Sequence, residues 1–289
     1  MALKASHGSV QGAASRVATR RGALARIVRS KPLVSYFVLT YAFSWMCWIP
    51  LAIMNRTVVV GALPTHFPGL LGPLLASLVL TAVTCGQRGV AGLVGRMTRW
   101  RVGIGWYLFA LSPIAFFAVA VCISRATGDG WPNLSDLGKF NGLPEFGILG
   151  VWLTLILVNG YGEETGWRGF ALPRLQRMHG EIASALMLAV WWALWHLPLF
   201  FILESYRGLG VAAIPGFFFG LCCGSVVLAW LCNRTDGSIL LVAIWHGTYN
   251  LASGTVAAQG SIAVFVSIFV MIQAFAIVAF DLRARRMSR

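Results

Sequence analysis

The chain has 289 residues, of which 58% are hydrophobic and 11% are charged, and its formal net charge is +14. A soluble globular domain carries about 25% charged residues, so this composition excludes an ordinary water-soluble fold and predicts an integral membrane protein. No compact basic domain holds the positive charge. We therefore expect no nucleic-acid partner, and we expect contact with anionic lipid headgroups instead.

Residues 1–31 contain no acidic residue and are rich in Ala, Ser, Gly and Arg. This composition resembles that of an organellar transit peptide. It is also typical of a basic, disordered cytoplasmic tail, which is the interpretation we favour. No cleavable secretory signal is predicted, because the apolar run that starts near Leu33 is long enough to span a bilayer.

Eight apolar segments follow the tail, and a bilayer-spanning helix takes ~20 such residues. They are approximately Val34–Met54, Gly69–Cys85, Ile104–Ser124, Phe146–Tyr161, Ile182–Leu203, Gly210–Cys232, Ser238–Ala257 and Ser261–Phe280. The second and fourth are short, and we expect the fourth to continue as a helix through the polar residues after it. The predicted fold is an all-α, polytopic membrane helix bundle of about eight transmembrane helices.

The basic residues bear on this count, because cytoplasmic connections of membrane proteins are enriched in Lys and Arg. With eight spans, 19 of the 23 Lys and Arg residues share one side with both termini. The split predicts cytoplasmic termini, and the Ala-, Gly- and Arg-rich composition suggests a bacterial cell membrane. We expect one membrane domain, 32–282, followed by a basic cytoplasmic tail, 283–289.

A stripe of small residues runs along the sixth predicted span. Gly216, Gly220 and Gly224 recur at every fourth position and therefore share one face of a helix. In membrane helices such a face lets a neighbouring backbone approach closely. We expect tight helix packing there.

Few ionisable residues fall inside the predicted spans, and their cost in a membrane marks them as functional candidates. The stretch from Asn159 to Phe170 reads NGYGEETGWRGF and contains three of them. The full set of strongly polar residues in the spans is Glu163, Glu164, Arg168, His196, His246 and Asn250.

Helix spacing suggests how these residues face one another. Glu164 and Arg168 are four apart, so they share a helix face and can form an ion pair. Glu163 is rotated by ~100° from that face and is left to meet another group. Taken singly, such residues are often packing or anchoring groups. Together they can supply a base, a proton donor and oxyanion donors. We expect Glu163, His196, His246 and Asn250 to line a polar cavity open to the cytoplasm.

The motifs occur in the order Glu-Glu-x-x-x-Arg, Trp-x-x-x-His and His-x-x-x-Asn. This order resembles the family of type II CAAX prenyl endopeptidases and bacteriocin-processing or immunity proteins, over a predicted protease core of about 143–258. The resemblance implies an intramembrane endopeptidase. Its implied roles are Glu163 as the base that activates water, His196 as its partner, His246 and Asn250 as oxyanion donors, and Glu164 and Arg168 as supporting residues.

The implied substrate is a membrane-associated peptide or protein, a prenylated tail or a leader peptide. The implied mechanism needs no cofactor. A zinc site made of two His and a Glu is the alternative, although the sequence contains no His-Glu-x-x-His motif. Two other classes stay open: a non-catalytic membrane scaffold or bacteriocin-immunity protein, and a proton-coupled transporter that uses Glu163 in a proton relay. The sequence shows no clear internal repeat, which disfavours the transporter.

Overall fold

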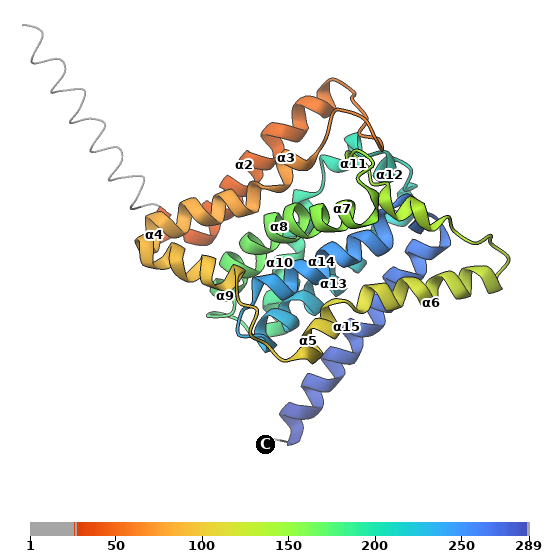
Figure 1. Ribbon diagram of the computed structural model, residues 1–289. Helices are drawn as coiled ribbons and strands as arrows, with labels where there is room; N and C mark the ends of the chain where they lie inside the picture. Colours follow the sequence, from red (N-terminus) through yellow and green to blue (C-terminus); the bar gives the residue numbers. More distant parts are fainter. Residues whose placement is uncertain (1–25, 27, 288–289) are drawn as a thin grey trace, which may run out of the picture.

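The computed structural model describes residues 26 and 28–287, and this part of the chain is almost entirely helical (Figure 1). The helices are α2 (Pro32–Ile53), α3 (Phe67–Leu70), α4 (Gly72–Met97), α5 (Ile104–Ala110), α6 (Ser112–Ala126), η1 (Leu134–Gly138), α7 (Gly147–Thr154), η2 (Leu155–Gly160), α8 (Tyr161–Gly166), η3 (Trp167–Ala171), α9 (Leu172–Leu175), α10 (Glu181–Trp195), α11 (Leu199–Ile202), α12 (Glu204–Arg207), η4 (Val211–Ala213), α13 (Ile214–Arg234), α14 (Ile239–Gly254), η5 (Val256–Ala258) and α15 (Ser261–Met287). Within the described residues, β-structure is limited to two isolated bridges, Val58–Leu203 and Val60–Asn141. The all-α fold is confirmed.

Five helical segments are long and apolar enough to cross a membrane: Pro32–Ile53, Phe67–Met97, Glu181–Ile202, Ile214–Arg234 and Ser261–Ala284. The pair α5 and α6, bent by 43°, makes a sixth if it counts as one span. The integral membrane fold is therefore confirmed, whereas the count of eight is not.

The other two predicted spans are helical but differ from simple transmembrane helices. The segment predicted at Phe146–Tyr161 is divided among α7, η2 and α8. Helix α14 has 16 residues, and at ~1.5 Å per residue it falls short of a hydrocarbon core ~30 Å thick. Helices α8 and α14 carry four of the six predicted site residues.

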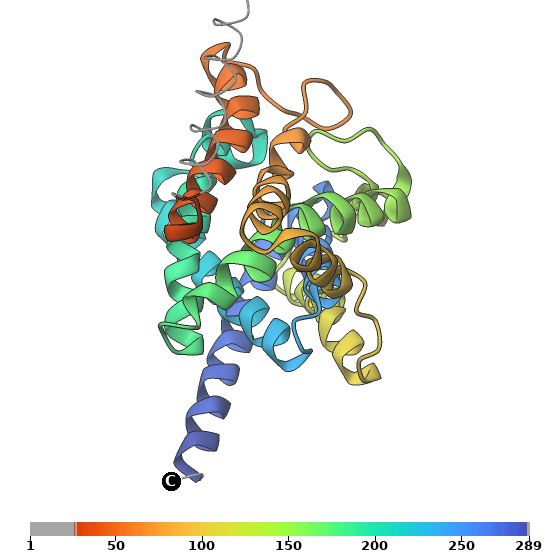
Figure 2. The same cartoon turned by 90° about the vertical axis from the view of Figure 1, so that its left-hand side faces the viewer.

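The predicted N-terminal tail lies almost wholly outside the described residues, although residues 28–30 are helical. At the other end of the chain, α15 continues to Met287. The predicted C-terminal tail is therefore helical as far as this residue. Figures 1 and 2 show this end of α15 projecting beyond the other helices.

Helix α8 lies in the middle of the bundle, where it packs against α4 on one side and α14 on the other (Figure 1). It continues as a helix through both Glu residues, as predicted, but π-helical segments η2 and η3 flank it. Single π-helical turns often occur at functional sites. The two Glu side chains therefore lie on six residues of regular α-helix between two irregular turns.

Helix α14 approaches η2 closely, and Gly247 makes this approach possible. A Cβ atom at Gly247 would lie 2.7 Å from both Cα and N of Ile156, which are backbone atoms.

The predicted close packing at the small-residue stripe of α13 is wrong. A Cβ at Gly216 or Gly224 would meet nothing within 4 Å, and at Gly220 it would meet only Met271 Cε, at 3.7 Å. The close helix contact lies beside His246 instead.

Gly247→Ala is expected to destabilise the protein, because a new methyl group against fixed backbone atoms costs ~1–3 kcal/mol. Gly216→Ala is the matched control. It adds the same group where there is space and gains up to ~1 kcal/mol of helix propensity. Thermal melting in detergent compares the two variants. A melting temperature for Gly247→Ala at or above that of Gly216→Ala would contradict the close approach.

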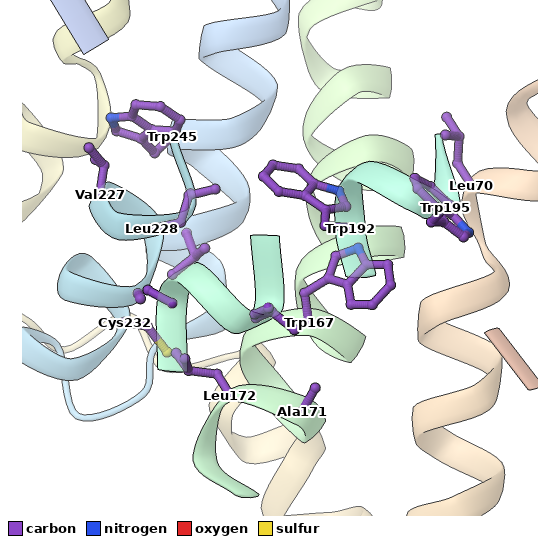
Figure 3. Packing of buried hydrophobic residues seen from close by; sticks show 14 of the residues in the cluster. Leu70, Trp167, Ala171, Leu172, Trp192, Trp195, Val227, Leu228, Cys232 and Trp245 are labelled. Atoms are coloured by element: carbon purple, nitrogen blue, oxygen red, sulfur yellow. The ribbon is translucent and has the colours of Figure 1, made fainter. Parts of the chain in front are cut away.

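Aromatic side chains fill the core between α2, η3 and α10. The rings of Trp167 and Trp195 lie 5.8 Å apart and those of Trp48 and Trp195 lie 4.8 Å apart, each pair edge to face. Figure 3 shows Trp167, Trp192 and Trp195 among these core residues. Helix α2 also bonds to α10: Trp45 Nε1 donates to the Trp195 carbonyl at 3.1 Å, and Trp195 Nε1 donates to Ser44 Oγ at 2.7 Å. These bonds fix the end of α10 next to His196.

Side-chain hydrogen bonds join loops at the end of the bundle that contains Asp129 and Arg207. Ser124 Oγ and Ser261 Oγ each donate to Asp129 Oδ2, at 2.7 and 2.6 Å, and these bonds lower the pKa of the Asp129 carboxyl. Arg207 Nη1 donates to Thr57 Oγ1 at 2.6 Å. In the predicted eight-span topology, the connections that contain Asp129 and Arg207 both lie on the side opposite the termini.

Candidate active site

Glu164, Arg168 and His246 form one buried cluster. Arg168 Nη1 lies 2.9 Å from Glu164 Oε1, and His246 Nδ1 lies 2.7 Å from the same oxygen. Glu164 and Arg168 are fully buried and His246 is 5% exposed. The predicted ion pair is confirmed. Because Arg168 and His246 share this carboxylate, Glu164 also links α8 to α14. His246 uses only one of its ring nitrogens, Nδ1, for this contact.

Glu163 faces a different partner, as its rotation from the ion-pair face predicts. Trp192 Nε1 donates to Glu163 Oε2 at 2.8 Å, and Glu163 is 2% exposed. No described residue donates a hydrogen bond to its second oxygen, Oε1. Each carboxylate therefore has one oxygen without a described protein partner, Oε1 of Glu163 and the buried Oε2 of Glu164. They differ in that two cationic or polar side chains bind Glu164, whereas one neutral donor binds Glu163.

His196 is held by the backbone of its own helix. Its Nδ1 lies 2.7 Å from the carbonyl oxygen of Trp192. A carbonyl only accepts hydrogen bonds, so Nδ1 carries a proton and Nε2 of the neutral ring is the accepting nitrogen. The tautomer of His196 is thus set by the residue one turn before it.

Trp192 contacts both His residues, Arg168 and Glu163, although the sequence pointed to it only through the Trp-x-x-x-His motif. Its ring centroid lies 5.6 Å from those of both His196 and His246. The guanidinium carbon of Arg168 lies 4.6 Å from the same ring. The Trp-x-x-x-His spacing was the available signal, because it places the two residues one helical turn apart. The bond to Glu163 joins residues 29 positions apart and leaves no local signal.

The structure brings together five of the six predicted site residues, and Asn250 is the exception. It lies one turn after His246 and is half-buried, and it forms no hydrogen bond with any described residue of the cluster. The other five side chains are at most 7% exposed. The polar cavity open to the cytoplasm stays a prediction.

The donors around the cluster do not assemble into a metal-binding set. Within residues 26 and 28–287, no group of three or more His, Cys, Asp or Glu side chains is placed to hold a metal ion. His246 Nδ1 is bonded to Glu164 and His196 Nδ1 to a carbonyl, so each ring has Nε2 free, as a metal-binding His also does. The zinc alternative stays open, and treatment with a chelator tests it.

Trp192→Phe is expected to lower kcat by about 10-fold or more. The change keeps an aromatic ring beside Arg168 but removes the donor to Glu163, and a hydrogen bond to a charged group contributes ~1.5–3 kcal/mol. Trp230→Phe is the control, because Trp230 Nε1 has no hydrogen-bond partner among the described residues. Equal kcat in both variants would show that the bond to Glu163 has no role.

Comparison with known proteins points to the same region of the chain. A family model described as type II CAAX prenyl endopeptidase Rce1-like matches residues 145–252, which include every residue of the cluster. The chain is also similar to the CAAX prenyl protease 2 of Methanococcus maripaludis, with 23% identity over 255 residues, 85% of this chain and 93% of that protein. A buried Glu-Trp-His-Arg cluster inside a membrane helix bundle, with these matches, defines a membrane peptidase. Over residues 145–252 the chain is similar to type II CAAX prenyl endopeptidases.

Proposed function

We propose that the protein cleaves peptide bonds within the membrane by a glutamate-activated water, with Glu163 as the general base. The observation that supports this most directly is that the two carboxylates have different hydrogen-bond partners. Arg168 and His246 both bind Oε1 of Glu164, whose other oxygen is buried, whereas Glu163 receives one hydrogen bond, from the neutral indole of Trp192, and its Oε1 has no described partner. A base needs such a free oxygen within reach of the proton it removes.

In this mechanism, water attacks the carbonyl carbon of the substrate while Glu163 Oε1 takes one of its protons. The tetrahedral intermediate carries the negative charge on the former carbonyl oxygen. Glu163 then gives the proton to the leaving nitrogen, the C–N bond breaks, and an amine and a carboxylic acid form. The base is regenerated without a covalent intermediate on the protein.

His246 is the proposed oxyanion donor. Its Nδ1 donates to Glu164 Oε1, which leaves Nε2 free of described partners. Two carboxylates and one guanidinium leave one negative charge unbalanced in a buried site, and a protonated His246 balances it. A preorganised donor of this kind contributes ~10²–10³ in kcat. His196 Nε2 accepts a hydrogen bond from the water and orients it.

The proposed substrate is a membrane-associated peptide with an apolar group near the cleaved bond. The name of the Methanococcus relative, CAAX prenyl protease, points to prenylated tails. Half-buried aromatic rings form an apolar surface that begins next to His196. Phe217 lies 5.9 Å from the His196 ring, and Phe200 and Tyr206 each lie 5.2 Å from Phe217. An apolar chain or side chain fits this surface better than a polar one does.

The test uses purified protein in proteoliposomes with three peptides: a prenylated CAAX-type tail, its unprenylated form, and a leader-type membrane peptide. Cleavage products are identified by mass spectrometry, with and without a chelator. We expect cleavage of at least one peptide, faster for the prenylated tail than for its unprenylated form, and unchanged by the chelator. Loss of activity on chelation, with recovery on adding zinc, would contradict the metal-free mechanism. Absence of cleavage of all three would favour a scaffold or an immunity protein.

A further inference from the structure

Arg96 lies in the last turn of α4 and binds two other parts of the chain at once. Its Nη1 donates to the Gly169 carbonyl at 2.8 Å and its Nη2 donates to the Arg168 carbonyl at 3.1 Å. Its Nε donates to the Gly237 carbonyl at 2.9 Å. One guanidinium group therefore joins η3, which carries Arg168, to the turn between α13 and α14.

The local backbone explains why these carbonyls accept a side chain. In η3 the π-helical turn interrupts the regular ladder of hydrogen bonds, and such interruptions are re-satisfied by other donors. Helix α13 ends at Arg234, and Asp236 and Gly237 have φ of 51° and 77°. Gly237 also gives Arg96 room, because a Cβ there would lie 2.7 Å from Arg96 Nε. A fixed planar fork with five donors suits this arrangement.

Gly237 is directly followed by the beginning of α14. Ser238 is the N-cap residue of this helix and accepts a hydrogen bond from the Leu241 amide at 3.3 Å. Its hydroxyl also donates to the Arg99 carbonyl, at 2.7 Å, at the end of α4. The end of α4 thus fixes the beginning of the helix that carries His246, and through Arg96 it fixes the turn that carries Arg168.

We propose that Arg96 is a positioning residue for the reaction. It holds η3 and the beginning of α14 at the spacing that lets Arg168 and His246 meet on one oxygen of Glu164. This role rests on the proposed function, because the purpose of the spacing is to present His246 to the substrate. A misplacement of ~1 Å at a reacting group can cost ~10² in rate.

The experiment compares Arg96→Ala and Arg96→Lys with Arg99→Ala. The Arg99 side chain lies at the same helix end and makes only an exposed contact, 3.8 Å from Asp236, so this control removes the same charge and keeps the backbone carbonyl. The first measurement, hydrogen exchange by mass spectrometry without substrate, is independent of activity. Peptides covering 165–175 and 236–246 should exchange about tenfold faster in Arg96→Ala and at the wild-type rate in Arg99→Ala.

The second measurement is kinetic. We expect Arg96→Ala to lower kcat by about 10-fold or more with little change in KM, Arg96→Lys to recover part of the loss, and Arg99→Ala to match wild type. In a His246→Ala background, Arg96→Ala should lower kcat much less, because both changes then act on one arrangement. Unchanged exchange in Arg96→Ala, or an equal loss of kcat in both backgrounds, would overturn the proposal. If Arg96→Ala exchanges faster but the wild-type protein cleaves no peptide, the structural role of Arg96 stands and the proposed function is refuted instead.

Discussion

Glu163→Gln is expected to lower kcat by at least about 10²-fold. Glutamine has nearly the same shape and its amide oxygen can still accept the hydrogen bond from Trp192 Nε1, but it cannot take a proton from water. Because the ring contacts of Trp192 are preserved, the melting temperature should stay close to that of wild type. The measurement is steady-state cleavage of a membrane peptide by purified protein in proteoliposomes.

The control for this prediction is Glu204→Gln. Glu204 is exposed on α12, so the same chemical change there should leave kcat unaltered. Wild-type turnover by Glu163→Gln would show that another group activates the water. A fall in kcat together with a large fall in melting temperature would show that Glu163 holds the fold instead.

Arg168→Ala is expected to have the largest effect on stability. The change leaves Glu164, which is fully buried, with His246 as its one charged or polar partner, and breaking a buried ion pair costs ~3–5 kcal/mol. Melting can be followed with a thiol-reactive dye, because Cys223 and Cys232 are buried and free. Activity should fall as well, since Glu164 then no longer holds His246 in place.

Glu164→Met combined with Arg168→Met separates charge from packing. Replacing both members of a buried ion pair by apolar residues is often neutral or stabilising, so the double variant should melt above Arg168→Ala. It should stay inactive, because His246 has lost its acceptor. Equal melting of wild type and Arg168→Ala would mean that the ion pair has no structural role.

The sequence predicted those features that depend on local periodicity. The pair Glu164–Arg168 follows from a spacing of four residues, and the different facing of Glu163 follows from a rotation of ~100° per residue. The helical path through both Glu residues was predicted for the same reason. Composition was enough to predict an integral membrane bundle, because lipid admits few other folds.

The features that were missed depend on contacts between distant segments. Arg96 bonds to residues 72 and 141 positions away, and no sequence pattern predicts such a contact. The π-helical turns and the 16-residue α14 were missed because an apolar run does not reveal how a helix is interrupted or how long it is. The glycine stripe of α13 was misread, because small residues permit a close approach but do not require one.

The central claim is that Glu163 acts as a base on water and does not attack the substrate itself. The most direct measurement is many-turnover cleavage in water enriched in oxygen-18, followed by mass spectrometry of the product and of the enzyme peptide that contains Glu163. Direct attack by water places the label in the new carboxyl group of the product and leaves Glu163 unlabelled. Attack by Glu163 forms a mixed anhydride, and each hydrolysis in which water attacks its Glu163 carbonyl places oxygen-18 in the Glu163 carboxylate. We expect label in the product alone, and labelled Glu163 would contradict the mechanism.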